Sequence, residues 1–140
     1  MILIIGGAYQ GKLEYARAEF GLKDEEISIV PKDSEACSAP DADSFPPLDL
    51  SRRAVYGLER WVLACVKDGK DPKEYLEQHQ DDLTGREDRI LIAMDISQGV
   101  VPMDPTERAW REENGRTLVW LAGKADRVVR VFCGIPQVIK

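Results

Sequence analysis

The sequence predicts an α/β fold with a mostly parallel sheet that carries helices on both faces. Two observations support this class. Short apolar runs typical of buried strands alternate along the chain with longer segments of helical character. The first apolar run also leads through a glycine-rich turn directly into a helix-forming segment, as in a β-α-β unit.

The first 31 residues predict that unit. Residues 2–5 are an apolar, β-branched run that two glycines stop, so we expect a strand buried on both faces. Residues 12–20 are mainly good helix formers, and Gly21 follows as a C-terminal stop. A second short strand is predicted over residues 27–30, closed by Pro31.

Residues 33–50 have the composition of a loop, because prolines stand among Asp, Ser and Ala without any apolar period. We expect this segment to be a mobile loop. A helix that ends at Gly69 is predicted next, and either Asp49 or Ser51 can cap its first turn. The apolar residues that recur at helical spacing in it are Val55, Leu58, Val62 and Val66.

The second half of the chain repeats the alternation. Helices are predicted over residues 71–80 and 104–122, each opened by an Asp-Pro pair that supplies a cap and a first-turn proline. An apolar strand over residues 89–95 lies between them and ends on a carboxylate. Strands over residues 127–133 and 135–139 complete the expected sheet.

Composition limits the class of protein. The chain has 140 residues, of which 44% are hydrophobic and 31% charged, so residues 1–140 are predicted to form a single domain. A net charge of −6 argues against nucleic acid or anionic lipid as partner, and a small molecule is expected instead. The three cysteines are widely spaced and form no CxxC pair. With no apolar run long enough for an export signal or membrane span, we expect a cytoplasmic protein.

The loop after the first strand has the spacing of a P-loop, with glycine, four residues, glycine and lysine. Glycines allow the backbone to curl and to aim several N–H groups at one anion, and the lysine adds a positive charge at the outer phosphates. This makes the expected fold P-loop NTPase-like. The alternative is a glycine-rich turn with an incidental lysine. The residues predicted to bind nucleotide are Gly6, Gly7, Ala8, Tyr9, Gln10, Gly11, Lys12 and Leu13.

An ordered set of motifs in the last third of the chain is more distinctive than the loop. The set resembles the adenosylcobinamide kinase/adenosylcobinamide-phosphate guanylyltransferase family, whose members have a P-loop at the start and a Gly-Ile-Val-Pro segment before an arginine-bearing helix. The similarity covers residues 1–20 and 88–140 and is poor across 33–85. Its segments here are Gly99-Val100-Val101-Pro102, Glu107 to Glu112, Gly115-Arg116, Ala125-Asp126 and Gly134-Ile135.

The resemblance implies a transferase of cobalamin biosynthesis that is often a trimer. Such enzymes phosphorylate the aminopropanol hydroxyl of adenosylcobinamide and then transfer GMP from GTP to the new phosphate, so the implied cofactors are GTP or ATP with Mg²⁺. The second reaction passes through a guanylylated histidine in typical members. His79, the one histidine here, lies outside the expected region, and we interpret it as a surface residue. The kinase step is therefore the expected activity.

Two further departures favour a second hypothesis. Leu13 stands where a P-loop normally has the Ser or Thr that ligates magnesium, and residues 117–119 replace an Asn-Gln pair of many relatives. A noncatalytic nucleotide- or corrinoid-binding homologue is thus the alternative to an enzyme. A P-loop kinase of another small substrate is a third hypothesis.

Three charged residues are predicted to join Lys12 in catalysis. Asp95 ends a buried strand, matches an acidic position of the family, and can either approach Mg²⁺ or cap the turn that follows it. Arg108 and Arg111 lie three residues apart on one helix, so they can clamp a phosphate. Alternatively, the two arginines pair with neighbouring glutamates on a solvated face, namely Glu107, Glu112 or Glu113.

Overall fold

The computed structural model describes residues 1–32 and 39–140. Within these residues the chain forms one six-stranded sheet in the order β2-β3-β4-β1-β5-β6. Every neighbouring pair is parallel except β5 and β6, which are antiparallel. This confirms the predicted mostly parallel sheet. The strands are β1 (Ile2–Gly6), β2 (Ile27–Ile29), β3 (Ala54–Tyr56), β4 (Ile90–Met94), β5 (Arg127–Phe132) and β6 (Ile135–Val138).

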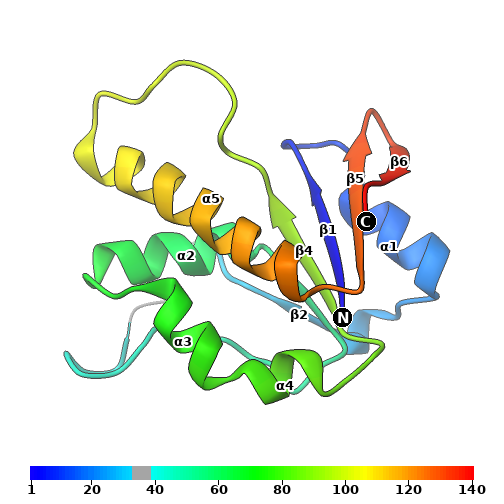
Figure 1. Ribbon diagram of the computed structural model, residues 1–140, viewed down its shortest axis with the longest axis horizontal. Coiled ribbons are helices and arrows are strands. Elements are labelled where there is room, and N and C mark those ends of the chain that lie inside the picture. The colour runs from blue at the N-terminus through cyan, green and yellow to red at the C-terminus, as the bar shows by residue number, and fades with distance from the viewer. Residues whose placement is uncertain (33–38) are drawn as a thin grey trace.

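Helices connect β1 to β2, β3 to β4 and β4 to β5, as the alternation along the sequence predicts, whereas the described residues between β2 and β3 contain no helix (Figure 1). Asp71 and Asp104 both cap the helix that follows them, by accepting hydrogen bonds from the backbone N–H groups of Lys73 and Glu107 at 2.9 Å. The α-helices are α1 (Lys12–Phe20), α2 (Leu58–Lys67), α3 (Pro72–Gln78), α4 (Gln80–Thr84) and α5 (Pro105–Lys124), and a 3₁₀ turn, η1, covers Asp24–Glu26.

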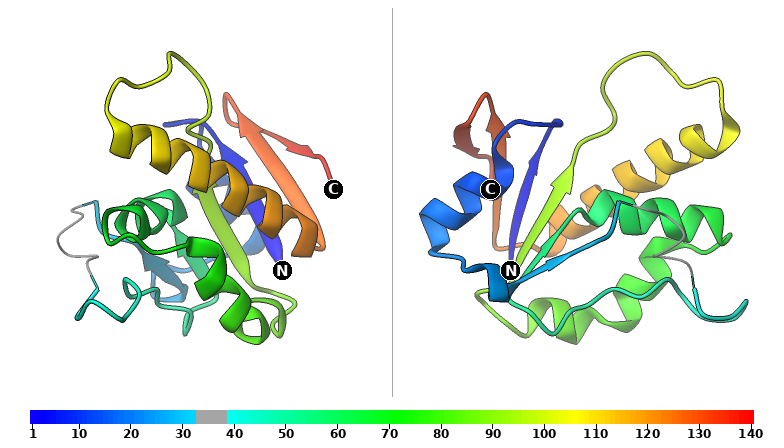
Figure 2. Two further views of the ribbon diagram at one scale, coloured as in Figure 1. Left: turned by 60° about the vertical axis from the view of Figure 1, so that its left-hand side comes forward. Right: turned by 180° about the vertical axis from the view of Figure 1, so that it is seen from behind.

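Alternate residues of the central strands enter two separate cores, because successive side chains of a strand point to opposite faces. Leu3 packs with residues of α2, α3 and α5 on one face, and Ile4 packs with Ala16 of α1 on the other. Figure 2 shows α1 alone on its side of the sheet and the remaining helices opposite. The predicted coverage of both faces is therefore confirmed. No helix among the described residues is both long and apolar enough to cross a membrane.

The helix predicted after Asp49 and Ser51 begins later than expected. Val55 belongs to β3, where it pairs with Ser28 and Leu91 of the neighbouring strands, and α2 starts at Leu58 after a left-handed Gly57. Instead of capping a helix, Asp49 accepts hydrogen bonds from the N–H and hydroxyl groups of Ser51 in a local turn. The helical prediction was wrong here because a three-residue strand is too short to show its own period.

Two other boundaries refine the predictions. The helix predicted to reach residue 80 ends at Gln78, and a separate short helix, α4, follows His79. Of the loop predicted over residues 33–50, residues 39–50 contain neither helix nor strand, and residues 33–38 lie outside the described residues. The mobility of this loop and the single-domain organisation of the chain stay predictions.

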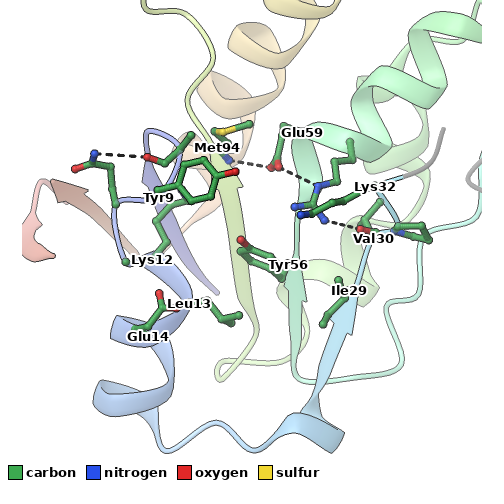
Figure 3. Close-up of a pocket in the computed structure, with 15 residues that line it drawn as sticks. Tyr9, Lys12, Leu13, Glu14, Ile29, Val30, Lys32, Tyr56, Glu59 and Met94 are labelled. Atoms are coloured by element: carbon green, nitrogen blue, oxygen red, sulfur yellow. Dashed lines mark hydrogen bonds and ion pairs between the residues drawn. The ribbon is translucent and has the colours of Figure 1, made fainter. Parts of the chain in front are cut away.

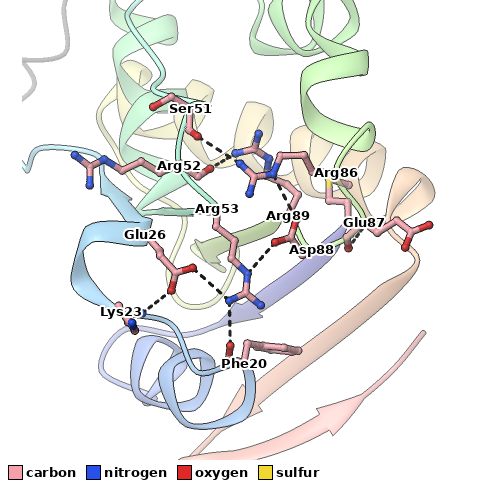
Figure 4. A network of polar contacts seen from close by, with 11 residues as sticks. Phe20, Lys23, Glu26, Ser51, Arg52, Arg53, Arg86, Glu87, Asp88 and Arg89 are labelled. Carbon is pink, nitrogen blue, oxygen red and sulfur yellow. Dashed lines mark hydrogen bonds and ion pairs between the residues drawn. The ribbon is translucent and has the colours of Figure 1, made fainter.

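Arginines hold the amino-terminal edge of the sheet together (Figure 4). Arg89 is 2% exposed and donates to the carbonyl oxygens of Leu50 at 2.7 Å and Asp82 at 3.0 Å, and also to that of Arg52. Its neighbour Arg53 donates to Phe20 O at 3.1 Å and lies near two carboxylates. These contacts tie the segment before β3 and helix α4 to the start of β4. These arginine contacts do not involve the opposite, carboxyl-terminal edge of the sheet.

Candidate functional site

A cavity of about 600 Å³ lies at the carboxyl-terminal edge of the sheet. It is bounded by the loop after β1, the start of α1, the ends of β2, β3 and β4, and the start of α2 (Figure 3). Ligands of open α/β sheets bind at this edge, and the volume is in the range of small-molecule sites. The lining residues are Ala8 to Glu14, Ile29 to Lys32, Tyr56, Glu59, Arg60 and Met94.

The loop between β1 and α1 forms one wall of this cavity. A Cβ atom on Gly6 would lie 2.4 Å from the carbonyl oxygen of Val131, so no side chain fits at that position. Gly11 has φ 81° and precedes the first turn of α1, where no side chain among the described residues caps the free N–H groups. Backbone amides at a helix start attract anions. The loop thus has positive φ angles at Tyr9 and Gly11 and an uncapped helix start, and anion binding by its amides stays a prediction.

Lys12 points back over this loop. Its Nζ donates a hydrogen bond of 2.6 Å to the carbonyl oxygen of Gly7, and the residue is 7% exposed. Burial lowers the pKa of Lys12, while the negative charges of Glu59 and Glu14 act in the opposite direction. The acceptor of this ammonium group is a neutral carbonyl oxygen, and a charged phosphate oxygen would form a stronger hydrogen bond with it.

Glu59 is a site residue that sequence reasoning missed. It lies in the first turn of α2, is 3% exposed, and its Oε2 accepts a hydrogen bond of 2.9 Å from Met94 N–H at the end of β4. The sequence prediction began this helix several residues too early, so Glu59 was not recognised as a residue of its first turn. The available signal was Gly57, because a glycine between strand and helix repeats the arrangement of Gly11 before α1.

Further charged and aromatic groups lie across the cavity from the loop. Arg60 donates to Val30 O at 2.8 Å, and its guanidinium carbon lies 5.4 Å from the centroid of the Tyr56 ring. Lys32 is exposed at the same side. Three cations and two carboxylates therefore line the described part of the cavity, which suits a ligand with a negatively charged portion. Sequence reasoning assigned no role to these residues.

Asp95 lies beside the loop, although it is outside the cavity lining. Its N–H donates to Gly6 O at 3.0 Å, and its Oδ1 accepts hydrogen bonds from the N–H and hydroxyl groups of Ser97. Burial acts to raise the pKa of Asp95, but the Ser97 hydrogen bonds and the charge of Arg130 together bring it below the ordinary value. The turn-capping role expected for Asp95 is confirmed, and the carboxylate is held ionised next to the loop.

Arg108 and Arg111 hold the segment that precedes α5. Arg108 donates to the carbonyl oxygens of Pro102 and Met103, and Arg111 donates to those of Gln98 and Gly99. Neither arginine lines the cavity or forms an ion pair within the described residues. The alternative in which they pair with Glu107, Glu112 or Glu113 is therefore not observed, and Arg116 pairs with Glu112 and Glu113 instead.

His79 lies at the junction of α3 and α4, away from the cavity lining. Its ring stacks on Tyr75 with 4.0 Å between centroids, and Nδ1 lies 2.9 Å from the carbonyl oxygen of Tyr75. The imidazole is half-buried, so the surface position predicted for it was only partly right. Nothing in this arrangement brings it to a phosphate.

The residues at the loop fit a nucleotide with its magnesium ion. Leu13 offers no oxygen, and the described residues contain no cluster of three or more metal-ligating side chains. Mg²⁺ bound with nucleotide commonly uses one or two carboxylates and takes its other ligands from phosphates and water. Asp95 would supply such a carboxylate next to the loop, and the amides of the loop and α1 would supply the phosphate contacts.

The sheet, the glycine loop and the buried lysine together define an α/β protein with a P-loop-like fold. A model of the family "Cobinamide kinase / cobinamide phosphate guanyltransferase" matches residues 55–139, which is more than half of the chain. The chain belongs to this family, whose named activities are those of nucleotide-dependent transferases of cobalamin biosynthesis. No match to a curated protein was found.

Proposed function

We propose that this protein phosphorylates adenosylcobinamide at the expense of GTP or ATP. The observation that carries the proposal is the position of Lys12 and the uncapped start of α1 on the wall of the 600 Å³ cavity. The family match supports the substrate class, although the loop itself lies before the matched residues 55–139.

The residues of the loop bind and orient the phosphates in this proposal. Backbone N–H groups of residues 7–13 contact the outer phosphate oxygens, and Lys12 leaves Gly7 O to neutralise charge that develops during transfer. Asp95 holds the position from which Mg²⁺, when bound, would polarise the transferred phosphate. Arg60 and Lys32 are proposed to contact the remainder of the nucleotide or the acceptor from the opposite wall.

Arg108 and Arg111 keep a proposed role on the transferred phosphate. Either guanidinium would have to exchange a carbonyl partner in the segment 98–103 for a phosphate oxygen. A charged acceptor forms a stronger hydrogen bond with arginine than a neutral carbonyl does. Movement of this segment is therefore part of the proposed catalytic cycle.

The phosphoryl transfer is favoured over guanylyl transfer. Phosphoryl transfer depends mainly on positioning and charge stabilisation, which the loop, Lys12 and Asp95 can provide. A covalent GMP intermediate requires a nucleophile beside the phosphates, and His79 is stacked on Tyr75 outside the cavity. Guanylyl transfer by this chain would need a histidine from elsewhere.

The noncatalytic alternative is favoured by Leu13, which offers no metal-ligating hydroxyl in the first turn of α1, in addition to the altered residues 117–119. In that case the protein binds a nucleotide or corrinoid without turnover. A homo-oligomer, with a trimer as the expected form, and a cytoplasmic location belong to both versions of the proposal.

Incubation with adenosylcobinamide, Mg²⁺ and γ-labelled GTP or ATP tests the enzyme. Label transfer to the corrinoid that is lost in Lys12→Met supports the kinase. Binding without transfer supports the noncatalytic alternative. Nucleotide hydrolysis or transfer that needs another acceptor would replace adenosylcobinamide as the substrate.

A further inference from the structure

The loop after β1 is held from the side by the turn between β5 and β6. The carbonyl oxygen of Gln10 accepts a hydrogen bond of 3.1 Å from Gly134 N–H, and its side-chain Oε1 accepts one from Cys133 N–H. The amide nitrogen of the same side chain lies 3.5 Å from Ala8 O. One residue thus joins both sides of the loop to a turn more than 120 positions away in the sequence.

The turn that makes these contacts has an unusual backbone. Cys133 and Gly134 have φ values of 51° and 75°, both in the left-handed region. A non-glycine residue in that region is uncommon and is kept there by its surroundings. The N–H groups of both residues point to Gln10, so the left-handed turn and the two hydrogen bonds belong to one arrangement.

Strand β5 also limits the start of the loop. The carbonyl oxygen of Val131 occupies the space beside Gly6, and a Cβ atom on Gly11 would lie 3.5 Å from the Cα of Gly134. The β5–β6 hairpin stands beside the carboxyl-terminal end of β1 in Figure 1. The loop is therefore in contact with the hairpin at its first, fifth and sixth residues.

We propose that Gln10 is a positioning residue and that the Cys133–Gly134 turn fixes the phosphate loop in its binding conformation. The inference deepens the proposed function, because it assigns to the C-terminal hairpin a part in nucleotide binding. An anion site made of backbone amides depends on their common direction, and Tyr9 next to Gln10 is fully exposed and offers no packing of its own. Gln10 replaces that missing support with hydrogen bonds.

Two glycines give a matched pair of variants. Gly134 and Gly69 have φ values of 75° and 67°, and neither has an atom within 4 Å of a Cβ placed on it. Gly134→Ala and Gly69→Ala therefore impose the same kind of backbone strain, one beside the loop and one beyond the end of α2. A third variant, Gln10→Leu, keeps the size of the side chain and removes the acceptor for Cys133 N–H.

The test measures the affinity for GTP and ATP with Mg²⁺ by calorimetry, together with thermal unfolding of each variant. Gly134→Ala and Gln10→Leu are expected to weaken binding about fivefold each, the effect of one hydrogen bond. Their combination should weaken it by less than the product, since both variants loosen the attachment of Gln10 to the same turn. Gly69→Ala should bind like the wild type despite a comparable loss of stability. Equal affinities of Gly134→Ala and Gly69→Ala, or strictly multiplicative effects in the double variant, would overturn the inference.

Hydrogen exchange separates this inference from the proposed function. Amide exchange of residues 8–11 and 133 should accelerate in Gly134→Ala and Gln10→Leu but not in Gly69→Ala, with no ligand present. If the wild-type protein binds neither nucleotide, the proposed function is refuted, and the exchange data alone decide whether the turn holds the loop. Unchanged amide exchange in both Gly134→Ala and Gln10→Leu would contradict the inference that the turn holds the loop.

Discussion

Lys12 combines burial with a positive charge, and this combination determines how the site responds to pH. The residue lies against the loop with Gly7 O as its hydrogen-bond acceptor, and burial lowers the pKa of its ammonium group. Glu59 lies on the same cavity and favours the charged form. The spacing of glycines and lysine predicts Lys12 from sequence, whereas Glu59 becomes visible only when the start of α2 is known.

The affinity for nucleotide should fall as pH rises through the pKa of Lys12, and this loss should begin at a lower pH than for an exposed lysine. The charged form binds phosphate, so binding is fully present below that pKa. Between this pKa and that of the unfolded chain, the unfolded state holds more protons, so the free energy of unfolding should increase with pH. Calorimetric titrations at several pH values check the first expectation, with Lys12→Arg as the control that stays charged.

Glu59→Gln should lower the pKa of Lys12 further, because the negative charge that opposes the effect of burial is removed. The alkaline loss of nucleotide binding should therefore move to lower pH. The glutamine oxygen can still accept from Met94 N–H, so the fold should be retained. Glu59→Leu leaves that N–H without its acceptor and should cost about 1–3 kcal/mol of unfolding free energy. Urea denaturation compares the two variants, and equal losses would contradict this account of the hydrogen bond.

At the scale of elements, long periodic segments were predictable and short ones were not. The spans of α1 and α5 follow from helix formers and Asp or Gly caps, and the five apolar runs expected to form strands all lie in the sheet. Strand β3 was missed because Val55, Leu58 and Val62 happen to continue one helical stripe across Gly57. The contacts of Arg108 and Arg111 could not be predicted either, because no sequence pattern indicates which backbone carbonyl group of an irregular segment will accept a hydrogen bond.

Arg89 is expected to stabilise the junction of three elements without acting in the site. Arg89→Met would leave the carbonyl groups of Leu50, Arg52 and Asp82 without their common donor. Since the site is at the other edge of the sheet, nucleotide affinity should be unchanged while the free energy of unfolding falls by about 3 kcal/mol. Arg86→Met is the control, because Arg86 is exposed and its loss should change stability by less than about 0.5 kcal/mol. Denaturation midpoints of the two variants that coincide would refute this role.

In the molecule as a whole, the stabilising polar contacts and the candidate site lie at opposite ends of the strands. Arginines and helix connections occupy the amino-terminal edge, while the glycine loop, the cavity and Asp95 occupy the carboxyl-terminal edge. The alternation of strands and helices predicts this division, because all strands up to β5 are parallel and end at the same edge. The far wall of the cavity, with Arg60 and Lys32, could not be predicted, since it requires the order of strands in the sheet.

Self-association is expected to involve the outer strand of the sheet. β6 lies at the edge, and its apolar residues Ile135 and Val138 are exposed, next to Phe132 and Ile139. Exposed apolar residues on an edge strand are unfavourable in a monomer. Sedimentation should therefore give a mass at least twice the 15.7 kDa of one chain, and Val138→Lys should reduce that mass. A wild-type protein that sediments as a monomer at micromolar concentration would contradict the expectation.

Calorimetry of the wild-type protein with GTP or ATP and Mg²⁺ tests the central claim most directly, which is that the loop from Gly6 to Lys12 binds phosphate. The arrangement predicts a dissociation constant in the micromolar range for at least one of the two nucleotides. In Lys12→Met, which keeps the length and burial of the side chain without its charge, the affinity should fall by about two orders of magnitude. Absence of binding by the wild type, or equal affinities of the two proteins, would contradict it.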